Sequence, residues 1–168
     1  LTTMARIFIA IRLTEQFKQP LLETQAKLKE HGVKGFYASK ENMHLTLAFI
    51  GETDKLPEIK QVISEIKFEP FVIRNSHIGC FNHERAQVLW MGLEESEQLQ
   101  WIAAEVRRKL NECGVDCDQK PFRAHITLAR KPSKFITDID VQQSEMLVER
   151  ISVMETVTQN GRPIFVER

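Results

Sequence analysis

The sequence predicts an α+β fold built from antiparallel sheets and flanking helices. Strand-like and helix-like segments are interspersed along the 168 residues. Many successive strands are separated by short turns, whereas parallel strands need long crossover connections. No Gly-rich phosphate loop follows any strand, which argues against a doubly wound nucleotide-binding fold. The length suits one domain, and no Pro/Gly/Ser-rich linker divides it, so we treat residues 4–168 as a single domain.

The first half of the chain predicts strands and two helices. Arg6–Ile11 is rich in β-branched and aromatic residues and predicts a strand. Pro20 suits the first turn of a helix, which runs to about His31 and is stopped by Gly32. The remaining elements predicted here are strands at 36–38 and 43–50 and an amphipathic helix at 56–66.

The second half predicts more strands and one further helix. Asn160-Gly161 is the strongest short signal for a β-hairpin, because both residues readily adopt a positive φ. Before it, apolar residues alternate over 147–153. The other predicted elements are strands at 71–81, 86–93, 124–129 and 164–166, with a polar turn at 82–85, and an amphipathic helix at 99–110.

Composition and charge are those of an ordinary globular protein. The chain is 42% hydrophobic and 27% charged, and its 23 basic residues balance 23 acidic ones. A basic field over the whole protein is therefore excluded, and any contact with RNA must be local.

Cysteine count and hydropathy indicate the compartment. Three cysteines argue against a disulfide framework and for a reducing environment, and no apolar run is long enough to cross a membrane. We expect a cytoplasmic, soluble protein. Leu1-Thr2-Thr3 precede Met4, and we expect them to be a remnant of cloning that takes no part in the fold.

A short motif, His-x-Thr-Leu, occurs twice, beginning at His44 and at His125. Residues two apart on a strand share a face, so each histidine points the same way as the threonine that follows it, Thr46 or Thr127. The residues between them point to the opposite face, which suits a core. If the two strands lie near one another, two imidazoles and two hydroxyls converge.

Two histidines suit acid–base chemistry at phosphorus. Their ordinary pKa of about 6.5 lets one act as base on the nucleophile while the other protonates the leaving oxygen. Threonine hydroxyls can hold the non-bridging oxygens, and the ring strain of a 2′,3′-cyclic phosphate removes an obvious need for a metal ion. For a single copy of the motif, structural hydrogen bonding is the better explanation, but the second copy makes that explanation much weaker. A zinc site is disfavoured because neither motif contains Asp, Glu or Cys.

The paired motifs resemble those of the 2H phosphoesterase superfamily, and most closely its RNA 2′,3′-cyclic phosphodiesterase branch, also described as LigT-type 2′-5′ RNA ligases. Two positions depart from the pattern: Ala124 stands where many members have Pro, and Thr156 where Ser is frequent. The other segments that resemble this branch are Arg6–Ala10, Asn42, Phe49–Gly51, Val88–Gly92, Ala129-Arg130 and Gly161–Phe165.

The resemblance implies a bilobal fold of two antiparallel sheets with flanking helices, related by a pseudo-two-fold axis, and an active-site cleft between them. The resemblance implies that His44 is the general acid that protonates the leaving 3′-oxygen and that His125 is the general base that deprotonates water. Because the two motifs are symmetric, the two roles could be exchanged. The resemblance also implies Thr46, Thr127 and Arg130 as phosphate ligands. Strict strand alternation, however, places Arg130 on the core face.

The implied partners are RNA with 2′,3′-cyclic phosphate ends or 2′,3′-cyclic nucleotides, bound by a monomer without cofactor or metal. Phe49 and Phe122 could stack on a base or pack in the core. RNA ligation, the reverse reaction, and a non-catalytic RNA-binding module remain alternatives. A basic cluster near the second motif could attract RNA or form a solvated loop: Lys120, Arg123, Arg130, Lys131 and Lys134.

Overall fold

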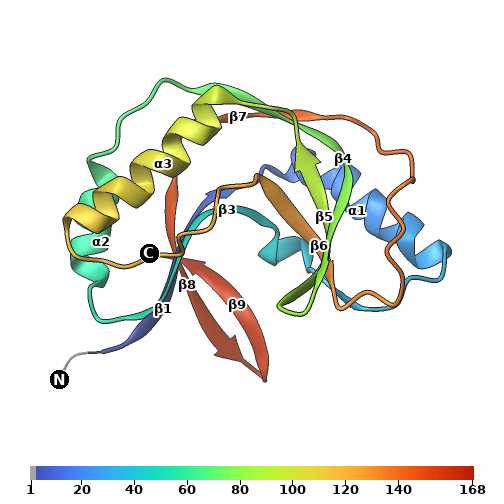
Figure 1. The fold of residues 1–168 in the computed structure, drawn as a ribbon, viewed down its shortest axis with the longest axis horizontal. Coiled ribbons are helices and arrows are strands. Elements are labelled where there is room, and N and C mark those ends of the chain that lie inside the picture. The colour runs from blue at the N-terminus through green and yellow to red at the C-terminus, as the bar shows by residue number, and fades with distance from the viewer. Residues whose placement is uncertain (1–2) are drawn as a thin grey trace.

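Two antiparallel sheets and three α-helices form the fold, as the computed structural model shows for residues 3–168 (Figure 1). The expectation for Leu1 and Thr2 lies outside the described residues. The elements are β1 (Ala5–Arg12), α1 (Glu15–Glu30), β2 (Phe36–Tyr37), a 3₁₀ turn (Lys40–Asn42), β3 (His44–Thr53), α2 (Leu56–Ser64), β4 (Phe71–His83), β5 (Ala86–Leu93), α3 (Glu97–Glu112), β6 (His125–Arg130), β7 (Glu145–Val148), β8 (Ser152–Gln159) and β9 (Arg162–Glu167).

The two sheets have related strand orders. The first is β3-β1-β8-β9 and the second is β2-β6-β5-β4-β7, with every pairing antiparallel. The predicted α+β class with antiparallel sheets is therefore confirmed. β3 and β6 carry the two motifs, and each pairs on one side with a long strand, β1 or β5. β3 and β6 also contact each other, which brings the two sheets together at the motifs.

The helices divide between the sheets. α2 and α3 pack on the first sheet, through β8 and β3, whereas α1 packs on the second, through β6 and β7 (Figure 1). One large cluster of buried apolar side chains takes residues from both sheets and all three helices. In the described part of the chain, no helix is both long enough and apolar enough to cross a membrane.

The first helix starts earlier than predicted. α1 begins at Glu15, because the Thr14 side chain accepts a hydrogen bond from the Phe17 amide at 3.1 Å and so caps the helix. Pro20 therefore lies inside α1 rather than in its first turn, and its missing N–H removes one helical hydrogen bond. The prediction was wrong at this boundary because it placed the start of the helix near Pro20, whereas the helix is capped by Thr14 and starts at Glu15.

The C-terminal hairpin is confirmed, but the alternating segment before it is divided. Asn160 and Gly161 have φ values of 52° and 76°, as a two-residue turn between β8 and β9 requires. The residues over 147–153 do not form one strand. β7 joins the second sheet beside β4, whereas β8 joins the first sheet beside β1, so the link between them crosses from sheet to sheet.

Candidate active site

The two motif histidines are held by the same kind of hydrogen bond. His44 Nδ1 donates to the Asn42 carbonyl at 2.7 Å, and His125 Nδ1 donates to the Arg123 carbonyl at 2.7 Å. A carbonyl can only accept, so Nδ1 carries the proton and Nε2 keeps the lone pair in each neutral ring. Thr46 Oγ1 donates to His44 Nε2 at 2.9 Å. Both rings thus have the tautomer in which Nε2 exchanges protons.

β3 carries a β-bulge inside its motif. Thr46 and Ala48 lie opposite consecutive residues of β1, which makes Leu47 the extra residue. Leu47 and Ala48 are both buried, and the alternation of faces shifts by one position after them. Phe49 therefore lies on the face of Thr46 instead of the core face, and it is 39% exposed.

β6 carries the equivalent bulge at the same motif position. Thr127 and Ala129 lie opposite consecutive residues of β5, so Leu128 is the extra residue. Leu128 and Ala129 are both fully buried. Arg130 consequently lies on the exposed face of His125, and the expectation from strict alternation that it faces the core is wrong.

A buried glutamine of α1 fixes the second bulge. Gln25 is 6% exposed, and its Nε2 donates to the Leu128 carbonyl at 3.0 Å and to the Ala38 carbonyl at 2.8 Å. The Ala38 amide also donates to the Leu128 carbonyl at 3.0 Å. The extra residue of β6 therefore has a defined hydrogen-bond partner, which stabilises the turn of Arg130 toward the histidines.

Arg130 lies within electrostatic reach of both histidines. The pKa of His44 is lowered from 6.5 to about 4, mainly by burial; the Asn42 hydrogen bond raises it, and the positive charges of Arg130 and His125 lower it. Burial likewise lowers the pKa of His125, with Arg123 and Arg130 acting in the same direction. Both rings are therefore neutral at pH 7 in the free protein, and an anion placed between them and Arg130 would raise both pKa values.

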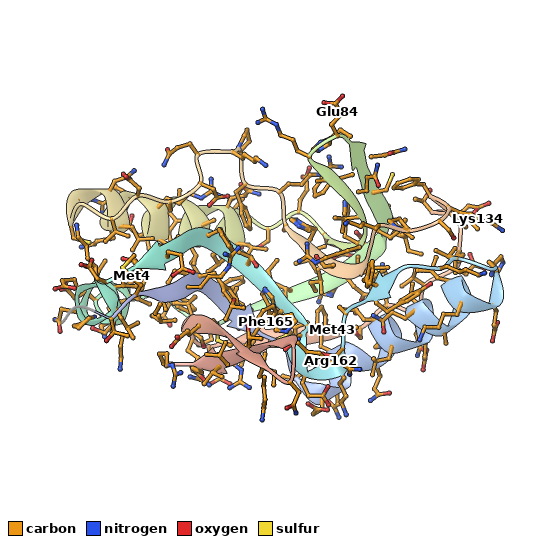
Figure 2. All side chains as sticks on the ribbon, turned by 90° about the horizontal axis from the view of Figure 1, so that it is seen from below. Met4, Met43, Glu84, Lys134, Arg162 and Phe165 are labelled. Carbon is orange, nitrogen blue, oxygen red and sulfur yellow. The ribbon has the colours of Figure 1, made fainter. Side chains whose placement is uncertain are left out.

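Aromatic side chains flank His44. The Phe8 ring of β1 lies 4.7 Å from the imidazole centroid, and the Phe165 ring of β9 packs edge-on at 4.9 Å. Phe8 is 2% exposed and also contacts Phe165, at 5.1 Å between ring centroids. Figure 2 labels Phe165 close to Met43, the residue before His44. These contacts explain why the His44 side chain is only partly exposed.

His125 is flanked by aromatic residues from different strands. The Phe81 ring of β4 lies edge-on at 5.1 Å, and the Trp90 ring of β5 lies at 5.9 Å. The Arg123 guanidinium lies over Trp90 at 4.9 Å and over Phe81 at 5.8 Å. Such cation–π contacts hold Arg123 beside His125, where it can meet an anionic ligand.

The remaining predicted residues, Phe49, Phe122 and Lys131, differ in how exposed they are. Phe122 is partly buried and packs against the main core. Phe49 is the more accessible ring, with the Arg6 guanidinium 5.4 Å above it. Lys131 is exposed, and its backbone amide donates to the Gln87 carbonyl at 2.8 Å. Within residues 3–168, no three His, Cys, Asp or Glu side chains gather as metal ligands.

The low pKa of His44 predicts a pH-dependent stability. Between pH 6.5 and about 4, the His44 imidazole is protonated in the unfolded chain but stays neutral in the folded protein. The free energy of unfolding therefore decreases as the pH falls. From pH 7 to pH 5 this amounts to about 2 kcal/mol. His44→Gln should remove that part of the loss in urea unfolding at the two pH values. Equal losses in wild type and variant would contradict it.

Comparison with known proteins places this geometry in context. The sequence profile of the 2′-5′ RNA ligase superfamily matches residues 14–160. An RNA 2′,3′-cyclic phosphodiesterase of Thermotoga maritima is 33% identical, covering 95% of this chain and 91% of that protein. One from Archaeoglobus fulgidus is 35% identical over 95% of this chain and 96% of its own.

Solved structures show the same fold. Escherichia coli LigT complexed with ATP superposes with a TM-score of 0.83 at 24% identity, covering 99% of this chain and 96% of that one. A protein of Thermus thermophilus gives a TM-score of 0.81 at 26% identity, covering 96% of this chain and 94% of its own. The overall fold of this chain is therefore shared with these proteins.

Proposed function

Because this chain belongs to the 2′-5′ RNA ligase superfamily, we propose that it hydrolyses the 2′,3′-cyclic phosphate ends of RNA to 2′-phosphomonoesters. One observation carries the proposal. Two histidines with the same fixed tautomer lie on strands that contact each other, β3 and β6, and the charge of one arginine, Arg130, acts on both. That set can supply a base, an acid and a phosphate ligand. The relatives from Thermotoga and Archaeoglobus are RNA 2′,3′-cyclic phosphodiesterases, which supports the same reaction for this chain.

The proposed reaction is an in-line displacement at phosphorus. His125 Nε2 takes a proton from water, whose oxygen attacks phosphorus opposite the 3′-oxygen. The P–O3′ bond breaks, and His44 Nε2–H protonates the departing 3′-oxygen, while the phosphate stays on the 2′-oxygen. Arg130, Thr46 and Thr127 hold the non-bridging oxygens as negative charge develops on them.

His44 must gain its proton when substrate binds. The free ring is neutral and accepts a hydrogen bond from Thr46. An anionic phosphate would raise the pKa of His44 and attract the Thr46 hydroxyl, which frees Nε2 to carry a proton. Arg123, Lys131 and Phe49 are proposed to contact the nucleotides beyond the reacting phosphate.

The exchanged assignment, with His44 as base, is the second candidate. The partial burial of His44 favours it, because burial keeps this ring neutral in the free protein. A cyclic substrate with sulfur in place of the 3′-oxygen separates the two. Its leaving group needs no proton, so it should restore turnover to the variant that lacks the acid and not to the one that lacks the base.

The proposed function is tested by one assay. Wild-type protein is incubated in EDTA with 2′,3′-cyclic AMP and with an RNA that ends in a cyclic phosphate, and the products are identified by ³¹P NMR. We expect a 2′-phosphomonoester from both. Absence of turnover would favour a binding module, and turnover that EDTA abolishes would contradict the metal-free mechanism. Adding an RNA with a 5′-hydroxyl tests ligation by the same residues.

A further inference from the structure

β9 is tied to the rest of the first sheet on both sides of Phe165. On one side, the Asn42 side chain donates from Nδ2 to the Pro163 carbonyl at 3.0 Å. Its Oδ1 accepts from the Phe165 amide at 3.4 Å. Asn42 thus bonds two backbone groups of β9, although it lies in the 3₁₀ turn that precedes β3.

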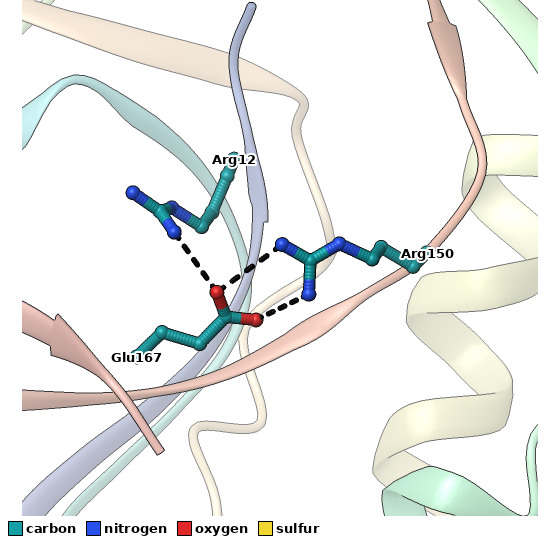
Figure 3. Close-up of polar contacts among 3 residues, drawn as sticks. All are labelled: Arg12, Arg150 and Glu167. Atoms are coloured by element: carbon teal, nitrogen blue, oxygen red, sulfur yellow. Dashed lines mark hydrogen bonds and ion pairs between the residues drawn. The ribbon is translucent and has the colours of Figure 1, made fainter.

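On the other side, Glu167 is clamped by two arginines (Figure 3). Arg12 donates to Oε1 at 2.9 Å, and Arg150 donates to both oxygens, at 2.6 and 3.2 Å. Burial alone would raise the pKa of Glu167, but the hydrogen bonds from Arg150 and Arg12 outweigh it and bring the pKa to about 2. Glu167 is therefore ionised throughout the pH range in which the histidines titrate.

The same asparagine also holds His44. Its backbone carbonyl accepts the Nδ1 proton of His44, while its side chain holds the strand whose Phe165 packs on that imidazole. One residue therefore fixes both the ring and the group that covers it. Arg12 adds to this arrangement, because it lies opposite His44 in the register of β1 and β3 and holds Glu167.

The second sheet has an asparagine clamp of the same form just before β7: Asn75 Nδ2 donates to the Gln142 carbonyl at 3.0 Å, and Asn75 Oδ1 accepts from the Ser144 amide at 2.6 Å. No aromatic ring of β7 packs on His125, however. β7 occupies the place in the strand order that β9 has in the first sheet, but it pairs only with Phe71–Arg74, at the start of β4. The rings beside His125 belong to β4 and β5 themselves. The packing of Phe165 from the edge strand β9 therefore distinguishes the environment of His44 from that of His125, although the two motifs match.

We infer that Asn42 and Phe165 are positioning residues for His44: by holding β9 against the imidazole, they fix the orientation of the ring and keep water from it. The inference rests on the proposed function for its catalytic consequence alone, because the positioning is a property of the free protein. Neither residue is assigned contact with the reacting atoms. Both act through His44.

The charged groups around His44 are few. Arg130 and His125 act on it from β6. On the other neighbouring elements, Arg12 is held by Glu167, Lys40 by Glu15, and Glu41 and Arg162 are exposed. None of these charged groups is replaced when Asn42 or Phe165 is substituted. A shift in the His44 pKa in such variants would therefore indicate that β9 covers the imidazole less well.

The first test is NMR titration of the imidazole nitrogens in the free protein. Phe165→Leu and Asn42→Ala should each raise the pKa of His44 by about 1 unit, because water reaches the ring, and leave His125 unchanged. The double variant should show less than the sum of the two shifts, since both act through one contact. Phe165→Met, whose flexible side chain adapts to irregular space, serves if Phe165→Leu fails to fold.

A matched control lies on the opposite face of the same strand pair. Glu155 lies opposite Val166 and accepts from Arg168 Nε at 2.7 Å, so Glu155→Gln loosens β9 without touching Phe165 or Asn42. This control should leave the His44 pKa unchanged. Unchanged His44 pKa values in folded Asn42 and Phe165 variants would overturn the inference. Equal shifts at His44 and His125 would overturn it as well, since they would indicate general loosening.

The second test is kinetic. With a 2′,3′-cyclic nucleotide, both variants should lower kcat by about 10-fold with little change in KM, because a misaligned imidazole affects the chemical step. The pH limb that depends on His44 should move with its pKa. If the pKa shifts but wild type shows no turnover, the proposed function fails and the positioning stands. If wild type turns over and the pKa does not shift, only the positioning fails.

Discussion

Replacing His44 or His125 by alanine is expected to lower kcat/KM for a 2′,3′-cyclic nucleotide by on the order of 10²–10⁴-fold, the usual contribution of one positioned proton-transfer group. Each ring presents Nε2 because its Nδ1 donates to a backbone carbonyl, so alanine removes the proton donor or acceptor and leaves the strand in place. The measurement is the pH dependence of kcat/KM. We expect a bell-shaped profile for the wild type, and each variant should lose one limb of that profile.

The control for this experiment is His77→Ala. His77 is exposed on β4 and is not followed by a threonine two residues later, as the motif histidines are. Its replacement should therefore leave kcat/KM unchanged. The double variant of His44 and His125 should lose much less than the product of the single losses, because the two act as a unit. A loss at His77 comparable to that at His44 would contradict the assignment.

Replacing Arg130 by glutamine should have the next largest effect, a loss of about 10²–10³-fold in kcat/KM, as expected for one donor to the developing phosphate charge. Its positive charge lowers the pKa of both imidazoles, so the same variant should raise both pKa values. Kinetics with a cyclic nucleotide and NMR titration of the free variant measure the two effects separately.

Lys131→Gln is the matched control for Arg130. Lys131 is the next residue and is exposed, and its proposed contact is with RNA rather than with the reacting phosphate. Lys131→Gln should leave turnover of a cyclic nucleotide unchanged. It should weaken the binding of a longer RNA, and the affinity for that RNA should then depend less on salt concentration. Loss of mononucleotide turnover in Lys131→Gln, or none in Arg130→Gln, would contradict these roles.

Strand periodicity predicted most of the fold and half of the site. Alternation is a local property of the chain, so it correctly placed Thr46 on the face of His44 and Thr127 on the face of His125. It misplaced Arg130, because a β-bulge depends on the register with a neighbouring strand, which the sequence of β6 does not contain. The buried Gln25 that holds this bulge comes from α1 and carried no motif at all.

The surroundings of the histidines were harder to predict for the same reason. Asn42 stood out only through its resemblance to related sequences, and nothing in its spacing indicated bonds to β9. Phe165 contacts His44 from the far end of the chain. Such contacts depend on how the strands are ordered in the sheet, whereas periodicity reports only which face of its own strand a residue occupies.

The position of β1 between β3 and β8 has a consequence for the kinetics of folding. β8 pairs with the N-terminal strand, and the nearby Arg12–Glu167 pair joins residues 155 positions apart, so the sheet that carries His44 requires closure of a very long loop. The β4–β5 hairpin of the other sheet requires only a short turn. Because non-local pairing slows folding, we expect the return of β8 to β1 to limit the refolding rate, and the surroundings of His44 to be completed after those of His125.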